Sequence, residues 1–147
     1  MCVVFLNFLN FCAGCGGIIS ADKAVIMSPN YPEDYPTNIN CEWEIIGEHL
    51  YHYQLSFLSF DLENSENCDA DFVEIYDGNV KNENSLRLRH CGDQLPDNNL
   101  LISTSDKILL VFKSNNEVVR SGWKLNLIKV KLYLEKIVRN VNFEMKF

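Results

Sequence analysis

Apolar and polar residues alternate with a period of two along much of the chain. In the stretch CEWEI, Cys41, Trp43 and Ile45 are separated by Glu42 and Glu44. Successive side chains of a β-strand point to opposite faces, so this pattern predicts a strand with one buried and one solvated face. The same alternation recurs in residues 51–57 (YHYQLSF), 85–91 (SLRLRHC) and 122–127 (GWKLNL).

The apolar parity changes at Leu58. Residues 51–57 carry their apolar side chains at odd positions, whereas the next apolar residues are Leu58, Phe60 and Leu62. One additional residue shifts a strand in this way, so we predict a β-bulge or a bend near Leu58.

Two further stretches extend the pattern. The run ILLVF (108–112) is apolar at every position, which predicts a central strand that lies between two sheets. Asp77-Gly78 follows a predicted strand and is typical of a turn, and we expect no further role for it. In residues 85–91 the alternation predicts that Leu86 and Leu88 both point inward.

Many short strands separated by turns predict an all-β fold, namely an antiparallel β-sandwich. The 147 residues, 47% of them hydrophobic, suffice for one domain with a core. We interpret residues 1–14 as an atypical signal peptide or the leader of a fragment, too short for direct membrane insertion. Residues 130–147 form a C-terminal extension whose apolar spacing favours a helix, with a strand near 131–134 or low order as alternatives.

The charge limits the choice of partners. The net charge is −7, and the body of the chain has no basic stretch, which argues against nucleic acid or an anionic membrane as the main partner. Residues 129–147 carry five Lys or Arg against two Glu. The negative charge therefore lies in the rest of the chain, where a cationic partner should bind.

Six cysteines occur, at positions 2, 12, 15, 41, 68 and 91. The C-x-x-C spacing of Cys12 and Cys15 lacks both a βαβ pattern and a second pair, so a redox or zinc site is the weaker interpretation. Disulfides in a secreted domain are favoured. Pairing the last four cysteines in sequential order would close two loops of similar size, each worth about 3 kcal/mol, but the sequence leaves the connectivity open. We expect Cys2 and Cys12 to lie outside the folded framework.

Carboxylates are dense between Phe60 and Asp77. They are Asp61, Glu63, Glu66, Asp69, Asp71, Glu74 and Asp77. Such a stretch is more often a solvated surface than a metal site. If these groups share a cation, calcium is the natural one, because it takes six to eight hard oxygen ligands. No glycine occupies the sixth loop position that an EF-hand requires.

A stiff segment precedes the first predicted strand, in the sequence SPNYPEDYPTNINCEW (28–43). Tyr31-Pro32 and Tyr35-Pro36 are two extended steps, because proline fixes its own φ and restricts the residue before it. A rigid loop can hold a tyrosine in one place at little entropic cost. The two tyrosines either cover one end of the sandwich or form a wall of a binding site.

An ordered series of motifs resembles the CUB domain family. The motifs are CGG at Cys15, SPNYPEDYPTNINCEWEI, FDLENSENCDADFVEIYDG, LRHCG, LLVFKSN and SGW. The resemblance covers residues 15–129 and implies an extracellular jelly-roll β-sandwich with disulfides Cys15–Cys41 and Cys68–Cys91. The SPNYP form is similar to repeats of cubilin and of tolloid-type proteins.

The resemblance to the calcium-binding CUB subset also implies a set of site residues. Glu63 and Asp71 match two of the metal ligands, and Tyr35 matches a tyrosine that packs against the ion and orients the glutamate. The third ligand position holds Asn115, where the subset has Asp. An amide oxygen carries no formal charge, so calcium affinity should fall unless Glu117 turns inward to compensate.

No catalytic motif is recognisable. His49 and His52 lack the glutamate of a zinc-protease helix, and neither a G-x-S-x-G elbow nor a phosphate-binding loop is present. We therefore expect a protein-binding module that is not an enzyme, in which a calcium-ordered acidic surface binds an extracellular protein ligand with exposed Lys or Arg. The alternatives are a noncatalytic, substrate-selecting domain of a secreted tolloid-like metalloprotease, with further CUB or protease domains in a longer parent chain, and a metal-free module resembling spermadhesins.

Overall fold

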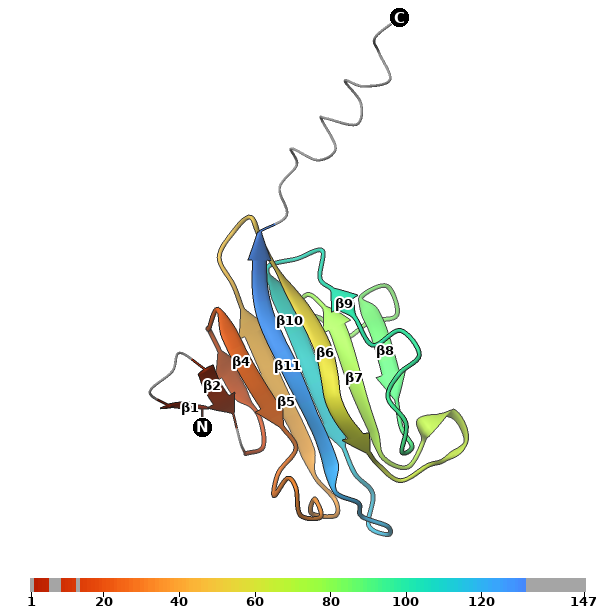
Figure 1. Cartoon of the computed structure of the whole chain (residues 1–147). Coiled ribbons are helices and arrows are strands. Elements are labelled where there is room, and N and C mark those ends of the chain that lie inside the picture. The colour runs from red at the N-terminus through yellow and green to blue at the C-terminus, as the bar shows by residue number, and fades with distance from the viewer. Residues whose placement is uncertain (1, 6–8, 13, 132–147) are drawn as a thin grey trace, which may run out of the picture.

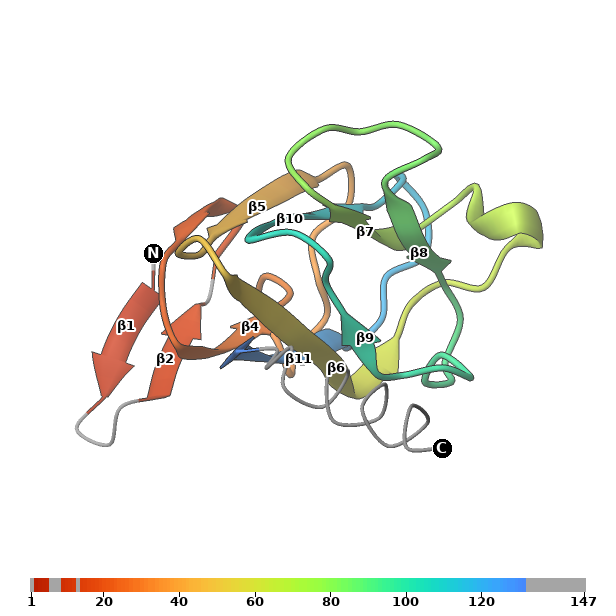
Figure 2. The same ribbon diagram turned by 90° about the horizontal axis from the view of Figure 1, so that it is seen from above.

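Two β-sheets pack face to face (Figure 1). The computed structural model describes residues 2–5, 9–12 and 14–131, with side chains from residue 14 onward. The first sheet has the order β1-β2-β4-β11-β6-β9 and the second β3-β5-β10-β7-β8. Viewed from above, β4, β11 and β6 form one layer and β5, β10 and β7 the other (Figure 2). The strands are β1 (Cys2–Phe5), β2 (Leu9–Cys12), β3 (Gly17–Ile19), β4 (Lys23–Met27), β5 (Asn40–Ile46), β6 (Tyr51–Asp61), β7 (Phe72–Asp77), β8 (Leu86–His90), β9 (Leu101–Ile102), β10 (Lys107–Lys113) and β11 (Gly122–Lys131), with one 3-10 turn, η1 (Glu66–Cys68).

The pairing is antiparallel except where β2 meets β4 and β3 meets β5, which are parallel. The all-β sandwich predicted from the alternation is confirmed. Both implied disulfides are present, Cys15–Cys41 and Cys68–Cys91. The first joins the segment before β3 to β5, and the second joins η1 to the end of β8.

The core consists of the alternating side chains that face the space between the sheets. Trp123 is fully buried at its centre and makes edge-to-face contacts with Trp43 at 5.4 Å, Phe112 at 5.9 Å and Phe57 at 6.1 Å between ring centroids. These rings come from β11, β5, β10 and β6, so the cluster joins both sheets. Each such pair contributes about 0.5–1.5 kcal/mol beyond the burial of its area.

β10 is the third of five strands in its sheet, as its apolar sequence predicts. Ile108, Leu110 and Phe112 face the core, whereas Leu109 and Val111 are buried on the opposite face against Tyr76. The central position of this strand is therefore confirmed. A second sheet covers only its inner face, whereas Tyr76 and Leu86 of the same sheet cover the outer face.

The bulge predicted near Leu58 is present. β11 pairs Lys124 with Ser59 but Leu125 with Phe57, so Leu58 is the additional residue of β6. Phe57 and Phe60 both reach the core and contact each other edge to face, whereas Leu58 is 54% exposed. The prediction was wrong in placing Leu58 in the apolar series, because the bulged residue has no place on the inner face.

A second irregularity contradicts the expectation for Leu86. β8 pairs Leu88 with Ile75 but Leu86 with Tyr76, so the register shifts at Arg87. Leu88 packs against the core, whereas Leu86 packs on the outer face. The alternation in the sequence is intact, but the bulge separates the two leucines onto opposite faces.

The chain ends depart from two expectations. β2 pairs in parallel with β4, with Cys12 opposite Ile26, and β1 pairs with β2, with Cys2 opposite Cys12. The backbones of both cysteines therefore lie within the sheet rather than outside it. Val130 and Lys131, assigned to the C-terminal extension, continue β11 beside His52 and Tyr51 of β6. The rest of that extension, 132–147, lies outside the described residues. The interpretation of 1–14 as a signal peptide or leader stays a prediction.

Within the described part of the chain, no helix is long and apolar enough to cross a membrane.

Asp77 does more than begin a turn, contrary to the sequence-based expectation. Its carboxylate accepts hydrogen bonds from the Thr104 backbone N–H (2.8 Å), the Thr104 hydroxyl (2.9 Å) and the Ser105 N–H (3.1 Å). Arg87 Nε lies 3.3 Å from the same carboxylate. Asp77 therefore fixes the segment between β9 and β10 to the end of β7.

Burial alone would raise the pKa of Asp77, but the hydrogen bonds from Thr104, Ser105 and Arg87 outweigh it and lower the pKa below the ordinary value of 3.8. A carboxyl whose pKa is lower in the folded state stabilises the fold above its ordinary pKa, and this contribution is lost as pH falls through the folded value.

We predict that Asp77→Asn lowers the free energy of unfolding at neutral pH by about 1–3 kcal/mol, because a charged acceptor of several donors is lost. The difference from wild type should begin to shrink below about pH 4, where the carboxyl of the unfolded chain takes up a proton, and should be lost as pH falls through the lower pKa of folded Asp77. Urea unfolding at several pH values measures both effects, with the exposed Asp97→Asn as control. A deficit that is equal at pH 3 and pH 7 would contradict the role of the charge.

Candidate functional site

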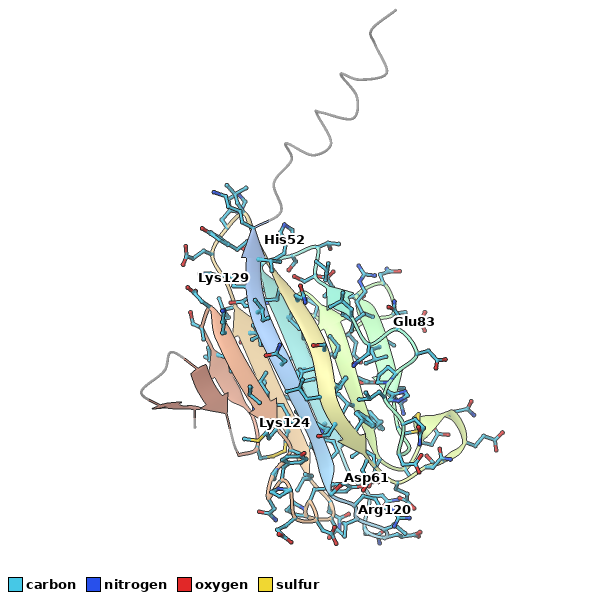
Figure 3. All side chains as sticks on the ribbon, in the orientation of Figure 1. His52, Asp61, Glu83, Arg120, Lys124 and Lys129 are labelled. Carbon is cyan, nitrogen blue, oxygen red and sulfur yellow. A yellow bond between two sulfur atoms is a disulfide. The ribbon has the colours of Figure 1, made fainter. Side chains whose placement is uncertain are left out.

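Three loops meet at one end of the sandwich, the end where Figure 3 labels Asp61 and Arg120. They are 28–39 between β4 and β5, 62–71 between β6 and β7, and 114–121 between β10 and β11. Backbone hydrogen bonds join the first loop to the third, from Tyr35 N–H to the Arg120 carbonyl (3.0 Å) and from Asn38 N–H to the Asn115 carbonyl (2.7 Å). Side chains from all three loops then form a single cluster.

Tyr35 lies at the centre of this cluster and is 1% exposed. Its hydroxyl donates to Asp71 Oδ2 (2.6 Å) and accepts from the Glu63 backbone N–H (3.1 Å). Its ring packs edge to face on Phe112, with 5.2 Å between centroids. Burial, together with the hydrogen bond to Asp71, raises the pKa of Tyr35, so the hydroxyl keeps its proton and remains a donor.

Gly122 makes room for this arrangement at the start of β11. Its φ of +85° lies in the left-handed region, and a Cβ there would meet the Ser28 hydroxyl at 1.9 Å and the Tyr35 ring at 3.5 Å. Glycine is therefore required by both the backbone conformation and the space.

Asp71 is fully buried. Besides the Tyr35 hydroxyl, its carboxylate accepts the Asn115 backbone N–H, which lies 2.7 Å from Oδ1. In the described residues no Lys, Arg or His forms an ion pair with Asp71 or Glu63. A buried carboxylate requires hydrogen-bond donors or a cation, and here donors from two loops meet that requirement.

The Asn115 side chain completes the connection. Its Nδ2 donates to Glu63 Oε2 (3.0 Å), while its Oδ1 accepts the Glu117 backbone N–H (2.9 Å). The structure thus brings together Tyr35, Glu63, Asp71 and Asn115, which we call the loop cluster. The Glu117 side chain is exposed, so this residue joins the cluster through its backbone and not by the inward-turned carboxylate that we considered.

The other tyrosine of the stiff segment lies elsewhere. The Tyr31 hydroxyl is 2.7 Å from the Ser59 hydroxyl on β6, and it takes no part in the loop cluster. The two Tyr-Pro steps therefore have different roles, and only the second one places a side chain among the predicted site residues.

A hollow of about 350 Å³ lies beside the loop cluster and was missed by the sequence analysis. It is lined by Asp61, Leu62, Asn64, Asp93 and Arg120. Asp61 accepts the Ser121 hydroxyl (2.8 Å), which ties β6 to the third loop. Asp93 and Arg120 are distant in sequence from the acidic stretch, so no local pattern could have assigned them to it. We call Asp61, Glu63 and Asp93 the acidic rim.

Only part of the loop cluster is suited to bind calcium. The carboxylates of Glu63 and Asp71 are hard oxygen donors of the kind that calcium prefers. Asn115 does not fit in its present orientation, because it directs N–H toward Glu63 and its oxygen is used by the Glu117 N–H. Among the residues with described side chains, no group of three His, Cys, Asp or Glu is arranged to hold a metal ion.

The comparisons with known proteins agree on one family. A profile described as the CUB domain matches residues 15–127. Human tolloid-like protein 1 is 33% identical over 119 residues, which are 81% of this chain and 12% of that protein. The human tumor necrosis factor-inducible gene 6 protein is 38% identical over 114 residues, 78% of this chain and 40% of that protein. The chain thus spans less than half the length of either relative.

Among solved structures, the MASP-1 CUB2 domain bound to Ca2+ has a TM-score of 0.66 and 27% sequence identity, and the match covers 80% of this chain and 99% of that one.

We predict that Tyr35→Phe lowers the free energy of unfolding by about 1–3 kcal/mol, because it removes one donor from the buried Asp71 and one acceptor from the Glu63 N–H. Urea denaturation measures the effect. Tyr31→Phe is the matched control, since it removes a hydroxyl from a contact with a single, partly buried serine. If the two variants are equally stable, Tyr35 does not hold the loops together.

Proposed function

The chain belongs to the CUB domain family, and on that premise we propose that it is an extracellular protein-binding module whose acidic rim binds a basic side chain of a protein ligand. CUB domains are noncatalytic interaction modules, and the proposal assigns no chemical step to this chain. The two disulfides support an oxidising, extracellular environment.

The observation that carries the proposal is the acceptor capacity left at Glu63. Its Oε2 receives the Asn115 amide, and the side chain is only partly buried. An ionised carboxylate has about four acceptor positions on its two oxygens, so Glu63 can accept further donors. A Lys ammonium is a compact donor with three N–H groups, and its hydrogen bond to a carboxylate is charge-assisted.

The charges that line the hollow also favour a basic ligand. Asp61, two residues before Glu63 in the sequence, and Asp93, in the segment after β8, line the hollow and supply negative charge to its wall. Its volume of about 350 Å³ lies at the small end of the range for ligand sites. Arg120 is the cationic group in the lining, so a basic ligand should approach from the Asp93 side.

Calcium enters the proposal in a limited way. The similar MASP-1 CUB2 domain was solved bound to Ca2+, and in this chain Glu63 and Asp71 are the hard oxygen donors that would hold such an ion. When bound, calcium would supply positive charge to the loop cluster. In this chain the Asn115 amide would have to turn away from Glu117 first, so the proposed docking of a basic ligand does not depend on the ion.

A second candidate concerns the parent protein. Identity of 33% to human tolloid-like protein 1 favours a noncatalytic, substrate-selecting domain of a longer secreted protease, in which other domains perform the reaction. The metal-free alternative resembling spermadhesins is supported by the hydrogen bonds of Asn115. Both are compatible with a rim that binds basic groups.

We predict that Nα-acetyl-lysine amide shifts the backbone NMR resonances of residues around Glu63 and Asp93, and that the shifts weaken as salt rises. Glu63→Gln should reduce the affinity about tenfold, because it removes the charge from the nearest acceptor but keeps an oxygen for Asn115.

Glu83→Gln is the matched control, because Glu83 lies in the exposed loop between β7 and β8, well away from the labelled Asp61 and Arg120 (Figure 3). If the two variants lose the same affinity, the interaction reflects net charge and the proposed site is wrong.

A further inference from the structure

We propose that Asn115, through its side-chain amide and its backbone N–H, takes the structural place of a calcium ion in the loop cluster, so that the acidic rim is ordered without metal. The identity of the ligand that the rim binds rests on the proposed function. The way in which the loops are held together does not depend on it. It follows from the chemistry of the cluster: the carboxylates of Glu63 and Asp71 suit calcium, whereas the amide of Asn115, as it is oriented, does not.

The first step is that Asn115 makes the connections that an ion between two carboxylates would make. Its Nδ2 donates to Glu63 Oε2 (3.0 Å), and its backbone N–H donates to Asp71 Oδ1 (2.7 Å). One residue of the third loop thereby binds both carboxylates of the second loop. The hydrogen bonds give each carboxylate a partner in the protein, where a cation would otherwise be needed.

The second step is that the orientation of the amide is determined by its surroundings. The backbone N–H of Glu117 can only donate, and it lies 2.9 Å from Asn115 Oδ1. Exchanging the amide oxygen and nitrogen would direct N–H against N–H at Glu117 and oxygen against the Glu63 carboxylate. The hydrogen-bond partners on both sides therefore require Nδ2 to face Glu63.

The third step is that the remaining loop is attached without an ion as well. Next to Asn115, the Ser114 hydroxyl accepts the Ile39 N–H (3.2 Å) and donates to the Pro36 carbonyl (2.8 Å). Together with Tyr35, these contacts join the first loop to the other two. Every pair of the three loops is therefore connected by protein hydrogen bonds.

Residue 115 thus decides between two ways of holding the rim. Aspartate at this position has no N–H to offer Glu63, and it would add a third negative charge to Glu63 and Asp71. Such a cluster requires a cation, whereas the asparagine cluster is already satisfied. A single substitution should convert one into the other.

The test compares wild type with Asn115→Asp in EDTA and in calcium at about 1 mM, the range in which extracellular modules bind the ion. We expect the melting temperature of wild type to be the same in both solutions. Asn115→Asp should melt lower than wild type in EDTA and rise in calcium, and calorimetric titration should show calcium binding at least tenfold tighter than to wild type.

If calcium raises the melting temperature of wild type as much as that of Asn115→Asp, the inference is overturned. Amide hydrogen exchange of wild type gives a measurement that needs no variant: the N–H groups of Glu63, Asn115 and Glu117 should be equally protected with and without EDTA, and loss of protection in EDTA would also overturn it.

The lysine probe separates this inference from the proposed function. If the probe binds in EDTA and the amide protection persists there, both stand. If it fails to bind while protection persists in EDTA, the proposed function fails and the role of Asn115 stands.

Discussion

A fully buried carboxylate must be paired, and the arrangement of the three loops at one end of this sandwich depends on how Asp71 meets that requirement. Its two oxygens receive the Tyr35 hydroxyl from one loop and the Asn115 N–H from another. Leaving either oxygen without its donor would cost about 1–3 kcal/mol, so the loops are held where the donors reach. The proposed binding surface is thus held by the hydrogen bonds that satisfy one buried carboxyl group.

The rest of the fold makes this position of Asp71 possible. The aromatic cluster around Trp123 fixes the two sheets, and Tyr35 packs on Phe112 of β10, the strand that leads into the Asn115 loop. Cys68 lies three residues before Asp71, and its disulfide with Cys91 ties the second loop to the end of β8. Each disulfide of this loop size contributes about 3 kcal/mol by restricting the unfolded chain. The strands, the Cys68–Cys91 disulfide and the buried carboxylate therefore all restrain the loops at this end of the sandwich.

The sequence predicts the fold well because burial imposes a period of two on strands. The parity change correctly located the bulge in β6, since Phe57 and Phe60 both have to reach the core. Leu86 could not be assigned, because its direction depends on a register shift between β7 and β8. The role of Asp77 was missed for a similar reason, since its partners Thr104 and Ser105 are far along the chain.

At the site, family resemblance identified the residues of the loop cluster but not what Asn115 does. The direction of its amide depends on the Glu117 N–H, which no sequence pattern specifies. The most direct measurement is a high-resolution crystal structure of wild type grown in calcium. The account predicts Asn115 Nδ2 within hydrogen-bonding distance of Glu63, with protein donors on both oxygens of Asp71. A calcium ion bridging Glu63 and Asp71, with the Asn115 oxygen turned toward it, would contradict the account.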